Sequence, residues 1–281
     1  MPLFATFKKP LIVAVCVAPD AKTISQTALQ SITAGADVVE VNVAQLSDAE
    51  IARVNLPLEF PYYVVCRRRK FMALYGLDWS ALPVRDDQAR MGLLSSMIDR
   101  GARALDMECD TFDSSGGIIP DSLPDEMQEL SVNEIPVRLQ MDVINSCRQR
   151  NAEVILSCHS RSALTSTHVL SLAGLMTDRG ADVIKIVNSH NDPMYCPTAL
   201  SAIIKLRESI PIPFLVTSVG PLSGVLRMAG CYLGNSYVFC RAEGQSFSYP
   251  DHPAIARVRE LWRLFPPGLT SEDASPQAGN F

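Results

Sequence analysis

The stretch Gly180-Ala181-Asp182-Val183-Ile184-Lys185-Ile186 decides the fold class of this chain. Two earlier stretches repeat its pattern, Gly35-Ala36-Asp37-Val38-Val39-Glu40-Val41 and Gly101-Ala102-Arg103-Ala104-Leu105-Asp106-Met107. In each, a glycine follows a helical segment and turns the chain into an apolar strand, as a glycine just past a helix C-terminus does. Strands that recur in this way with helices between them predict a parallel sheet built from βα units.

Eight such strands can be counted along the chain. They are expected at residues 11–18, 37–44, 62–67, 103–109, 153–159, 182–188, 213–219 and 236–241. Apolar residues at helical spacing occupy the segments between them. Eight βα units in about 265 residues favour a single-domain (β/α)8 TIM barrel, an α/β fold, over an open doubly wound sheet. No glycine-rich phosphate-binding fingerprint follows any strand, which argues against a dinucleotide-binding fold.

Two segments depart from this alternation of strands and helices. Residues 110–136 are too long, and too rich in proline, glycine and acidic residues, for a simple βα loop. Because they follow the fourth strand, we expect this insertion at the catalytic face, either as a lid or as a decorative insertion. Residues 266–281 are polar and rich in proline and glycine, and we expect a flexible C-terminal tail there. The barrel, as one catalytic domain, would then span residues 1–265.

Composition narrows the function classes. The chain of 281 residues is 47% hydrophobic and 20% charged, which suits one large globular domain. Its net charge of −5 argues against a general nucleic-acid-binding role. No apolar run long enough for a membrane span is present, and the first residues do not resemble a signal peptide. The eight cysteines show no CxxC pair and no zinc spacing, so we expect reduced core residues of a cytoplasmic protein.

A lone lysine, Lys185, stands in the middle of its apolar strand. A buried ammonium is costly unless it is paired or deprotonated, and an amine with a depressed pKa is a good nucleophile toward carbonyl groups. His159 ends the strand one helix upstream, so both groups would line one wall of an enzyme site. The alternative for Lys185 is a salt bridge to Glu40 or Glu108 across the barrel, and His159 could simply cap its strand end.

Other polar residues stand at the C-terminal ends of the strands, where a barrel of this kind builds its site. Glu40 lies on the second strand, and Arg67 begins the basic run 67–70 after the third. Arg67 is either a contact for a substrate anion or part of a solvated loop. Arg227 follows the seventh strand, and Gln245 follows the eighth. Arg227 is either a residue of the site or a residue on the surface of a helix. The remaining histidines are interpreted as surface or loop residues: His168, His190 and His252.

In their order and spacing, these segments together resemble the type I 3-dehydroquinate dehydratases, the Schiff-base enzymes of the shikimate pathway and so of aromatic amino acid biosynthesis. The resemblance runs from the first strand to Gln245. Its pieces are Val38-Val39-Glu40-Val41-Asn42, Leu105-Asp106-Met107-Glu108, Ile155-Leu156-Ser157-Cys158-His159, Ala181-Asp182-Val183-Ile184-Lys185-Ile186, Leu226-Arg227-Met228-Ala229-Gly230, Leu233-Gly234-Asn235 and Gly244-Gln245. The chain is similar to a divergent member of this lyase family.

The resemblance implies that the chain dehydrates 3-dehydroquinate to 3-dehydroshikimate. Lys185 would form an imine with the substrate ketone, and His159 would remove the α-proton and then protonate the departing hydroxyl. Arg227 would hold the substrate carboxylate, and Gln245 would hydrogen-bond ring hydroxyls. Glu40 would help to hold the basic groups in place.

The same resemblance implies no metal and no diffusible cofactor. The partner it implies is a small-molecule keto acid, with no nucleic acid and no membrane. Members of the family are often dimers, so a homodimer is one expectation.

The polar surroundings depart from the family pattern at several positions. Asn42 stands where the family has an arginine, Phe71 where it has an acid, and Arg241 where it has a substrate-contacting serine. Losing a hydrogen-bonding partner for a substrate hydroxyl can change selectivity by orders of magnitude. The alternatives are therefore a sister Schiff-base lyase or aldolase on another hydroxy-keto acid, or a non-catalytic sensor of shikimate-type metabolites. The presence of both Lys185 and His159 argues against the sensor.

Overall fold

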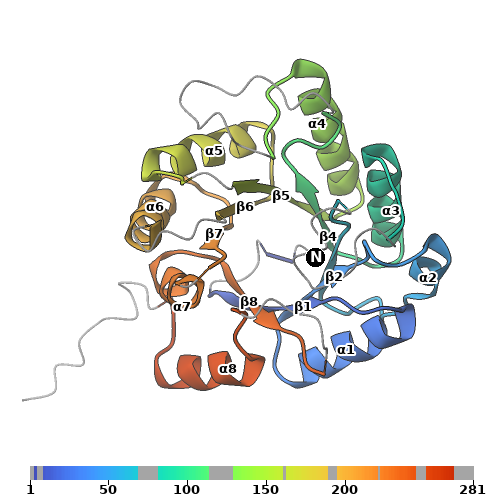
Figure 1. The fold of residues 1–281 in the computed structure, drawn as a ribbon, viewed down its shortest axis with the longest axis horizontal. Coiled ribbons are helices and arrows are strands. Elements are labelled where there is room, and N and C mark those ends of the chain that lie inside the picture. Colours follow the sequence, from blue (N-terminus) through green and yellow to red (C-terminus); the bar gives the residue numbers. More distant parts are fainter. Residues whose placement is uncertain are drawn as a thin grey trace, which may run out of the picture.

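The computed structural model describes residues 3–4, 9–68, 82–113, 129–160, 163–188, 195–220, 222–244 and 251–268. In these parts of the chain, parallel strands form one sheet that curves into a nearly closed barrel, and a ring of helices surrounds it (Figure 1). The strand order is β7-β6-β5-β4-β3-β2-β1-β8, so consecutive strands are neighbours and β8 returns beside β1. The predicted α/β TIM barrel is confirmed.

The strands fall on the eight stretches expected from the sequence, with ends shifted by one or two residues. They are β1 Leu11–Cys16, β2 Val38–Asn42, β3 Tyr62–Val65, β4 Ala104–Glu108, β5 Glu153–Ser160, β6 Val183–Asn188, β7 Phe214–Ser218 and β8 Tyr237–Arg241. Their residues are almost all buried, because one face of the sheet lines the barrel and the other packs against helices. This double burial explains why the strands appear in the sequence as continuous apolar runs.

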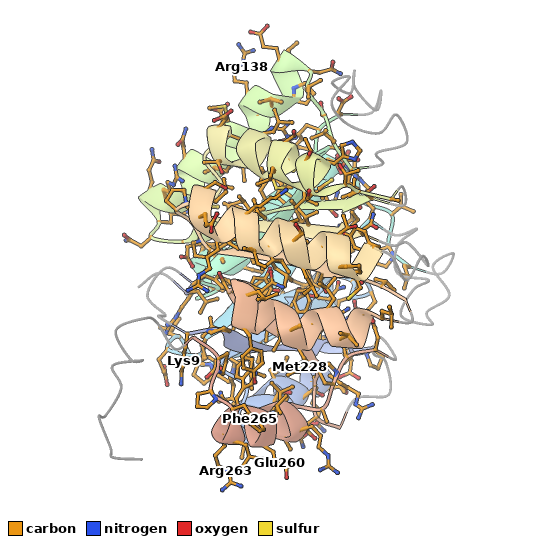
Figure 2. The ribbon with its side chains drawn as sticks, turned by 90° about the vertical axis from the view of Figure 1, so that its left-hand side faces the viewer. Lys9, Arg138, Met228, Glu260, Arg263 and Phe265 are labelled. Carbon is orange, nitrogen blue, oxygen red and sulfur yellow. The ribbon has the colours of Figure 1, made fainter. Side chains whose placement is uncertain are left out.

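The helices form the outer layer of the barrel. They are α1 Ala21–Thr33, α2 Asp48–Arg53, α3 Asp87–Asp99, α4 Glu134–Gln149, α5 Ser166–Asp178, α6 Tyr195–Ser209, α7 Ser223–Leu233 and α8 Ile255–Leu264. Asp20 and Asp86 cap α1 and α3, each accepting a backbone N–H at 2.8 Å. Figure 2 shows helices α4 to α8 side by side, with Arg138 on α4 and Arg263 on α8 pointing outward at the two ends of the row.

The three repeated glycines end helices as expected. Gly35, Gly101 and Gly180 follow α1, α3 and α5 and have φ angles of 104°, 104° and 88°. Glycine adopts this left-handed region without strain, whereas a side chain would be disfavoured there. Each glycine therefore directs the chain from an outer helix back into the strand that follows.

Leu3 and Phe4 cover the N-terminal end of the barrel. Their backbone N–H groups donate to Glu153 Oε2 at 2.6 and 2.8 Å. The Phe4 ring lies 5.8 Å from the ring of Tyr63 and 5.2 Å from that of Tyr237. Because Glu153 and Tyr237 are the first residues of β5 and β8, these contacts seal the end of the barrel opposite to the one where a site is expected.

Two expectations from composition can be compared with the fold. All eight cysteines are free thiols and buried, as expected for core residues. In the described ranges, no helix is both long and apolar enough to cross a membrane. Of the insertion at 110–136, residues 114–128 lie outside the described residues, as do residues 269–281 of the expected tail.

Candidate active site

Three ionisable side chains meet inside the barrel: Lys185 of β6, Asp106 of β4 and Glu40 of β2. Each stands five residues after one of the repeated glycines, so the repeat that builds these strands also carries the three side chains inward. Lys185 Nζ lies 2.8 Å from Asp106 Oδ2 and 3.8 Å from Glu40 Oε2. Ser157 Oγ donates to Asp106 Oδ1 at 2.6 Å, and the Tyr63 hydroxyl donates to Glu40 Oε2 at 2.5 Å. All of these side chains are buried.

Lys185 is paired with carboxylates, and its pKa is not depressed. Burial by itself lowers the pKa of this amine, but the carboxylates of Asp106 and Glu40 outweigh burial and raise it above the ordinary value. Lys185 is therefore an ammonium in the free protein, and of the two alternative ion pairs the one to Glu40 is present. Glu108 instead pairs with two arginines.

The pKa values of the two carboxyl groups beside Lys185 are shifted in opposite directions. Burial raises the pKa of Asp106, but the ammonium of Lys185, the guanidinium of Arg67 and the hydrogen bonds from Lys185 and Ser157 together outweigh it and leave that pKa below its usual value. For Glu40 burial prevails, and its pKa is raised. Asp106 is thus the permanent anion of the pair, whereas Glu40 is the carboxylate that more readily takes up a proton.

His159 lies on β5 next to this cluster and closer to solvent. Its strand neighbour on the same face, Ser157, is in register with Lys185. The His159 side chain is 22% exposed, against 6% for Lys185. Glu129 Oε2 lies 2.6 Å from His159 Nδ1 and also accepts the His159 backbone N–H at 3.0 Å. The ring is therefore held by a carboxylate and does more than cap a strand end.

The surroundings of the His159 ring favour its neutral form. Burial lowers its pKa, and the positive charge of Arg67 lowers it further, while Glu129 raises it without restoring the usual value. A neutral imidazole has one nitrogen free to accept a proton, as a general base requires.

Arg67 is buried between two carboxylates. Its Nη2 donates to Glu129 Oε1 at 2.7 Å, and its Nη1 lies 3.2 Å from Glu108 Oε1. Arg90 binds the other oxygen of Glu108. Arg68, the next residue of the basic run, is likewise paired with two acids, Asp87 and Asp110. The interpretation of these two arginines as a solvated loop is wrong, because each is paired with two acids.

Arg227 of α7 is 3% exposed, so its interpretation as a surface helix residue is wrong. Its Nη2 donates to Asp251 Oδ2 at 3.1 Å and to the Ser218 carbonyl at 3.3 Å. Within the described residues, its Nε and Nη1 have no hydrogen-bond partner. A buried guanidinium with two unmet donors is suited to donate hydrogen bonds to an anionic ligand such as a carboxylate.

An aromatic wall completes the site. The Lys185 ammonium lies 5.0 Å from the centre of the Phe239 ring, and the His252 ring stacks on Phe239 at 5.9 Å. His252 lies in a loop, as one of the two expectations had it, but it is buried and not on the surface; burial also lowers its pKa well below the usual value. His168, by contrast, is partly exposed and forms a capping box with Thr165 at the start of α5. His190 lies outside the described residues.

The positions that depart from the family pattern lie in different surroundings. Asn42 is buried, and its Oδ1 accepts the Ala44 N–H at 3.1 Å. Arg241 ends β8, two residues beyond Phe239 on the same face, and is exposed. Gln245 and Phe71 lie outside the described residues, so their roles stay predictions. In the described part of the chain, no group of three or more His, Cys, Asp or Glu side chains is arranged to hold a metal ion.

Sequence reasoning missed Glu129, Asp251 and the burial of His252. Glu129 belongs to the acid-rich insertion, but nothing in its local sequence separates it from the other acids there. For Asp106, noted as a strand-four acid but not as a partner of Lys185, a signal existed: its distance from Gly101 equals that of Lys185 from Gly180.

The comparisons with known proteins agree with this architecture. The family described as type I 3-dehydroquinase matches residues 12–266. The 3-dehydroquinate dehydratase of Desulfotalea psychrophila is 22% identical over 254 residues, which cover 90% of this chain and 98% of that protein. That of Geobacillus thermodenitrificans is 28% identical over 115 residues, 41% of this chain and 44% of that protein.

Solved structures share the fold. The type I 3-dehydroquinate dehydratase of Clostridium difficile superposes with a TM-score of 0.71 at 15% identity, covering 92% of this chain and 93% of that chain. The 3-dehydroquinate dehydratase of Geobacillus kaustophilus superposes with a TM-score of 0.69 at 16% identity, and the match covers 92% of this chain and 93% of that chain. The family match spans almost the whole barrel, and the chain therefore belongs to the type I 3-dehydroquinases, a family of dehydratases.

Proposed function

We propose that this chain dehydrates 3-dehydroquinate to 3-dehydroshikimate through a Schiff base on Lys185. The observation that carries the proposal is the Lys185 amine, held inside the barrel by Asp106 and Glu40, with His159 on the neighbouring strand nearer the mouth. An amine that must meet a ketone needs a fixed position and a nearby proton acceptor, and this cluster offers both. Membership of the family supports the choice of substrate.

The ammonium of Lys185 has to lose a proton before it can attack the ketone. Glu40 lies 3.8 Å from Nζ and has a raised pKa, so it is the suitable acceptor. Asp106, with its lowered pKa, stays ionised and stabilises the positive charge that returns to the nitrogen when the imine forms. The carbinolamine then loses water, and the protonated imine becomes the electron sink for the adjacent carbon.

His159 is the proton carrier of the elimination step. Its neutral ring takes the proton from the carbon next to the imine, and the resulting imidazolium gives that proton to the departing hydroxyl. The product leaves after water hydrolyses the imine and frees Lys185. One proton and one hydroxide thus leave the substrate together as water.

Replacing Arg227 with lysine tests the carboxylate site. Lysine keeps the charge and a contact for Asp251, but it loses the planar fork that binds a carboxylate through two N–H groups. We expect KM for 3-dehydroquinate to rise about 10-fold to 100-fold, with a smaller loss of kcat, because a hydrogen bond to a charged group contributes about 1.5–3 kcal/mol. Steady-state kinetics measure both constants. An unchanged KM would contradict the role of Arg227.

The test of the proposed function is the absorbance of the enone product on mixing the protein with 3-dehydroquinate. We expect a steady rise, and borohydride added during turnover should leave a covalent adduct that peptide mass spectrometry places on Lys185. An adduct with a different hydroxy-keto acid, without product from 3-dehydroquinate, would favour the sister lyase or aldolase. Tight binding of 3-dehydroquinate without an adduct would favour the sensor.

A further inference from the structure

Glu129 makes a closely defined set of contacts with His159. Its Oε2 lies 2.6 Å from His159 Nδ1 and accepts the His159 backbone N–H at 3.0 Å, so one oxygen holds both the ring and the strand. Its Oε1 accepts from Arg67 at 2.7 Å, and Arg67 is fixed in turn by Glu108. Glu129 itself is fully buried. The carboxylate is therefore immobilised from three directions.

The segment that carries Glu129 is anchored along the end of β4. Leu130 forms a parallel bridge with Cys109, and the Ser131 N–H donates to the Cys109 carbonyl at 3.1 Å. The buried Arg179 binds the carbonyls of Cys109 and Ser131 together. Through this anchor, the returning end of the 110–136 insertion delivers an acid into the site.

We propose that Glu129 is a positioning residue that holds the proton of His159 on Nδ1 and so leaves Nε2 to carry out the proton transfers. This inference rests on the proposed function, in which His159 is the acid and base. An ionised carboxylate can only accept a hydrogen bond, so the nitrogen that faces it must carry the hydrogen. In the neutral ring the lone pair then lies on Nε2.

The charges around the pair are consistent with this assignment. Burial raises the pKa of Glu129, but Arg67 and His159 lower it far more, so the carboxylate stays ionised. Three charged groups act on the His159 ring: Glu129 raises its pKa, whereas Arg67 and Lys185 lower it. Glu129 thus orients the ring, while burial and then Arg67 favour the neutral imidazole in spite of the adjacent carboxylate.

Glu129→Gln separates this role from simple structural support. Because Arg67 donates to the Oε1 position, the amide oxygen should stay there, and the amide nitrogen then gives up the bond from the His159 backbone N–H and presents its own N–H to Nδ1. The ring should therefore shift its hydrogen to Nε2 and lose its basic nitrogen at the reaction side. We expect kcat to fall about 100-fold with KM changed less than about 3-fold, while borohydride still traps the imine on Lys185. Because the variant removes a negative charge that raises the pKa of His159, the acid limb of kcat/KM should move to lower pH. The matched control is Glu134→Gln, which replaces an exposed acid at the start of α4 and should change neither kcat nor the pH profile.

The tautomer itself is measured without substrate by nitrogen-15 NMR of the His159 ring in the free protein. A proton on Nδ1 in the wild type, and on Nε2 in Glu129→Gln, is the expected result. A proton on Nε2 in the wild type overturns the inference, and this readout also decides the matter if the variant does not fold. An unchanged kcat and tautomer in the folded variant overturn it too. If 3-dehydroquinate gives neither product nor adduct, the proposed function fails while the NMR result still tests Glu129.

Discussion

Lys185→Ala is expected to lower the turnover of 3-dehydroquinate by at least ~10⁴-fold and to abolish the borohydride-trapped adduct, because alanine has no amine to form the imine. Neither Asp106 nor Glu40 can replace the amine, since carboxylates do not form imines. Product absorbance and peptide mass spectrometry measure the two losses. Lys205→Ala is the matched control: it removes an exposed lysine of α6 whose Nζ donates to Ser166 Oγ, and it should keep both turnover and the trapped adduct. Near wild-type activity in Lys185→Ala would contradict the Schiff-base mechanism.

The same substitution should also weaken the fold. It removes the cation from a buried cluster and leaves Asp106 without its ion-pair partner, at a cost of about 3–5 kcal/mol. An unpaired buried carboxyl group has a folded-state pKa above its unfolded value, so the loss of stability is small in acid and grows as pH rises. We therefore expect the difference in Tm from wild type to widen between about pH 5 and about pH 8. Activity is best compared under conditions where circular dichroism shows that the variant is folded.

His159→Ala is expected to lower kcat by about 10²-fold to 10⁴-fold while an adduct on Lys185 is still trapped, because the elimination loses its proton carrier but the imine-forming amine remains. Glu129 keeps its ion pair with Arg67 in this variant, so its carboxylate is not left unpaired. The loss of stability should accordingly be smaller than for Lys185→Ala.

Two observations check this prediction. Single-turnover mixing followed by borohydride should reveal the adduct in His159→Ala even when product forms slowly. His168→Ala removes a partly exposed histidine that caps α5 and should leave kcat unchanged. If no adduct forms in folded His159→Ala, then His159 acts in assembling the imine, and the assignment of Lys185 alone to that step is wrong.

Much of the fold follows from short-range patterns in the sequence. The glycines at positions 35, 101 and 180 have the left-handed φ angles that their place before apolar strands predicts, and all eight strands occur where apolar runs predict them. Such features depend on backbone sterics and on burial from both faces, which act within a few residues. The same local pattern also reveals polar residues of the interior, since Lys185 is a single charged residue within an apolar strand.

The charge states could not be predicted in the same way. The apolar strand around Lys185 left open whether its amine is paired or deprotonated, and only the carboxylates of Asp106 and Glu40, far away in sequence, raise its pKa. Arg227 resembles a surface helix residue in its own segment, and only its packing against Asp251 and Ser218 shows that it is buried. Electrostatic effects of this kind depend on distances across the barrel, which local sequence does not encode.

The sequence by itself determined the barrel, the inward strand positions of Glu40, Asp106 and Lys185, and the resemblance to the dehydratase family, because repeat spacing and apolar periodicity are local properties. The tertiary structure alone decided which charges meet. It paired Lys185 with Asp106, and it placed Glu129, from an insertion whose sequence has no regular pattern, against His159. The physical reason is that an ion pair across the barrel is a contact between distant segments, whose partners are chosen by the closure of the sheet and the anchoring of the loops.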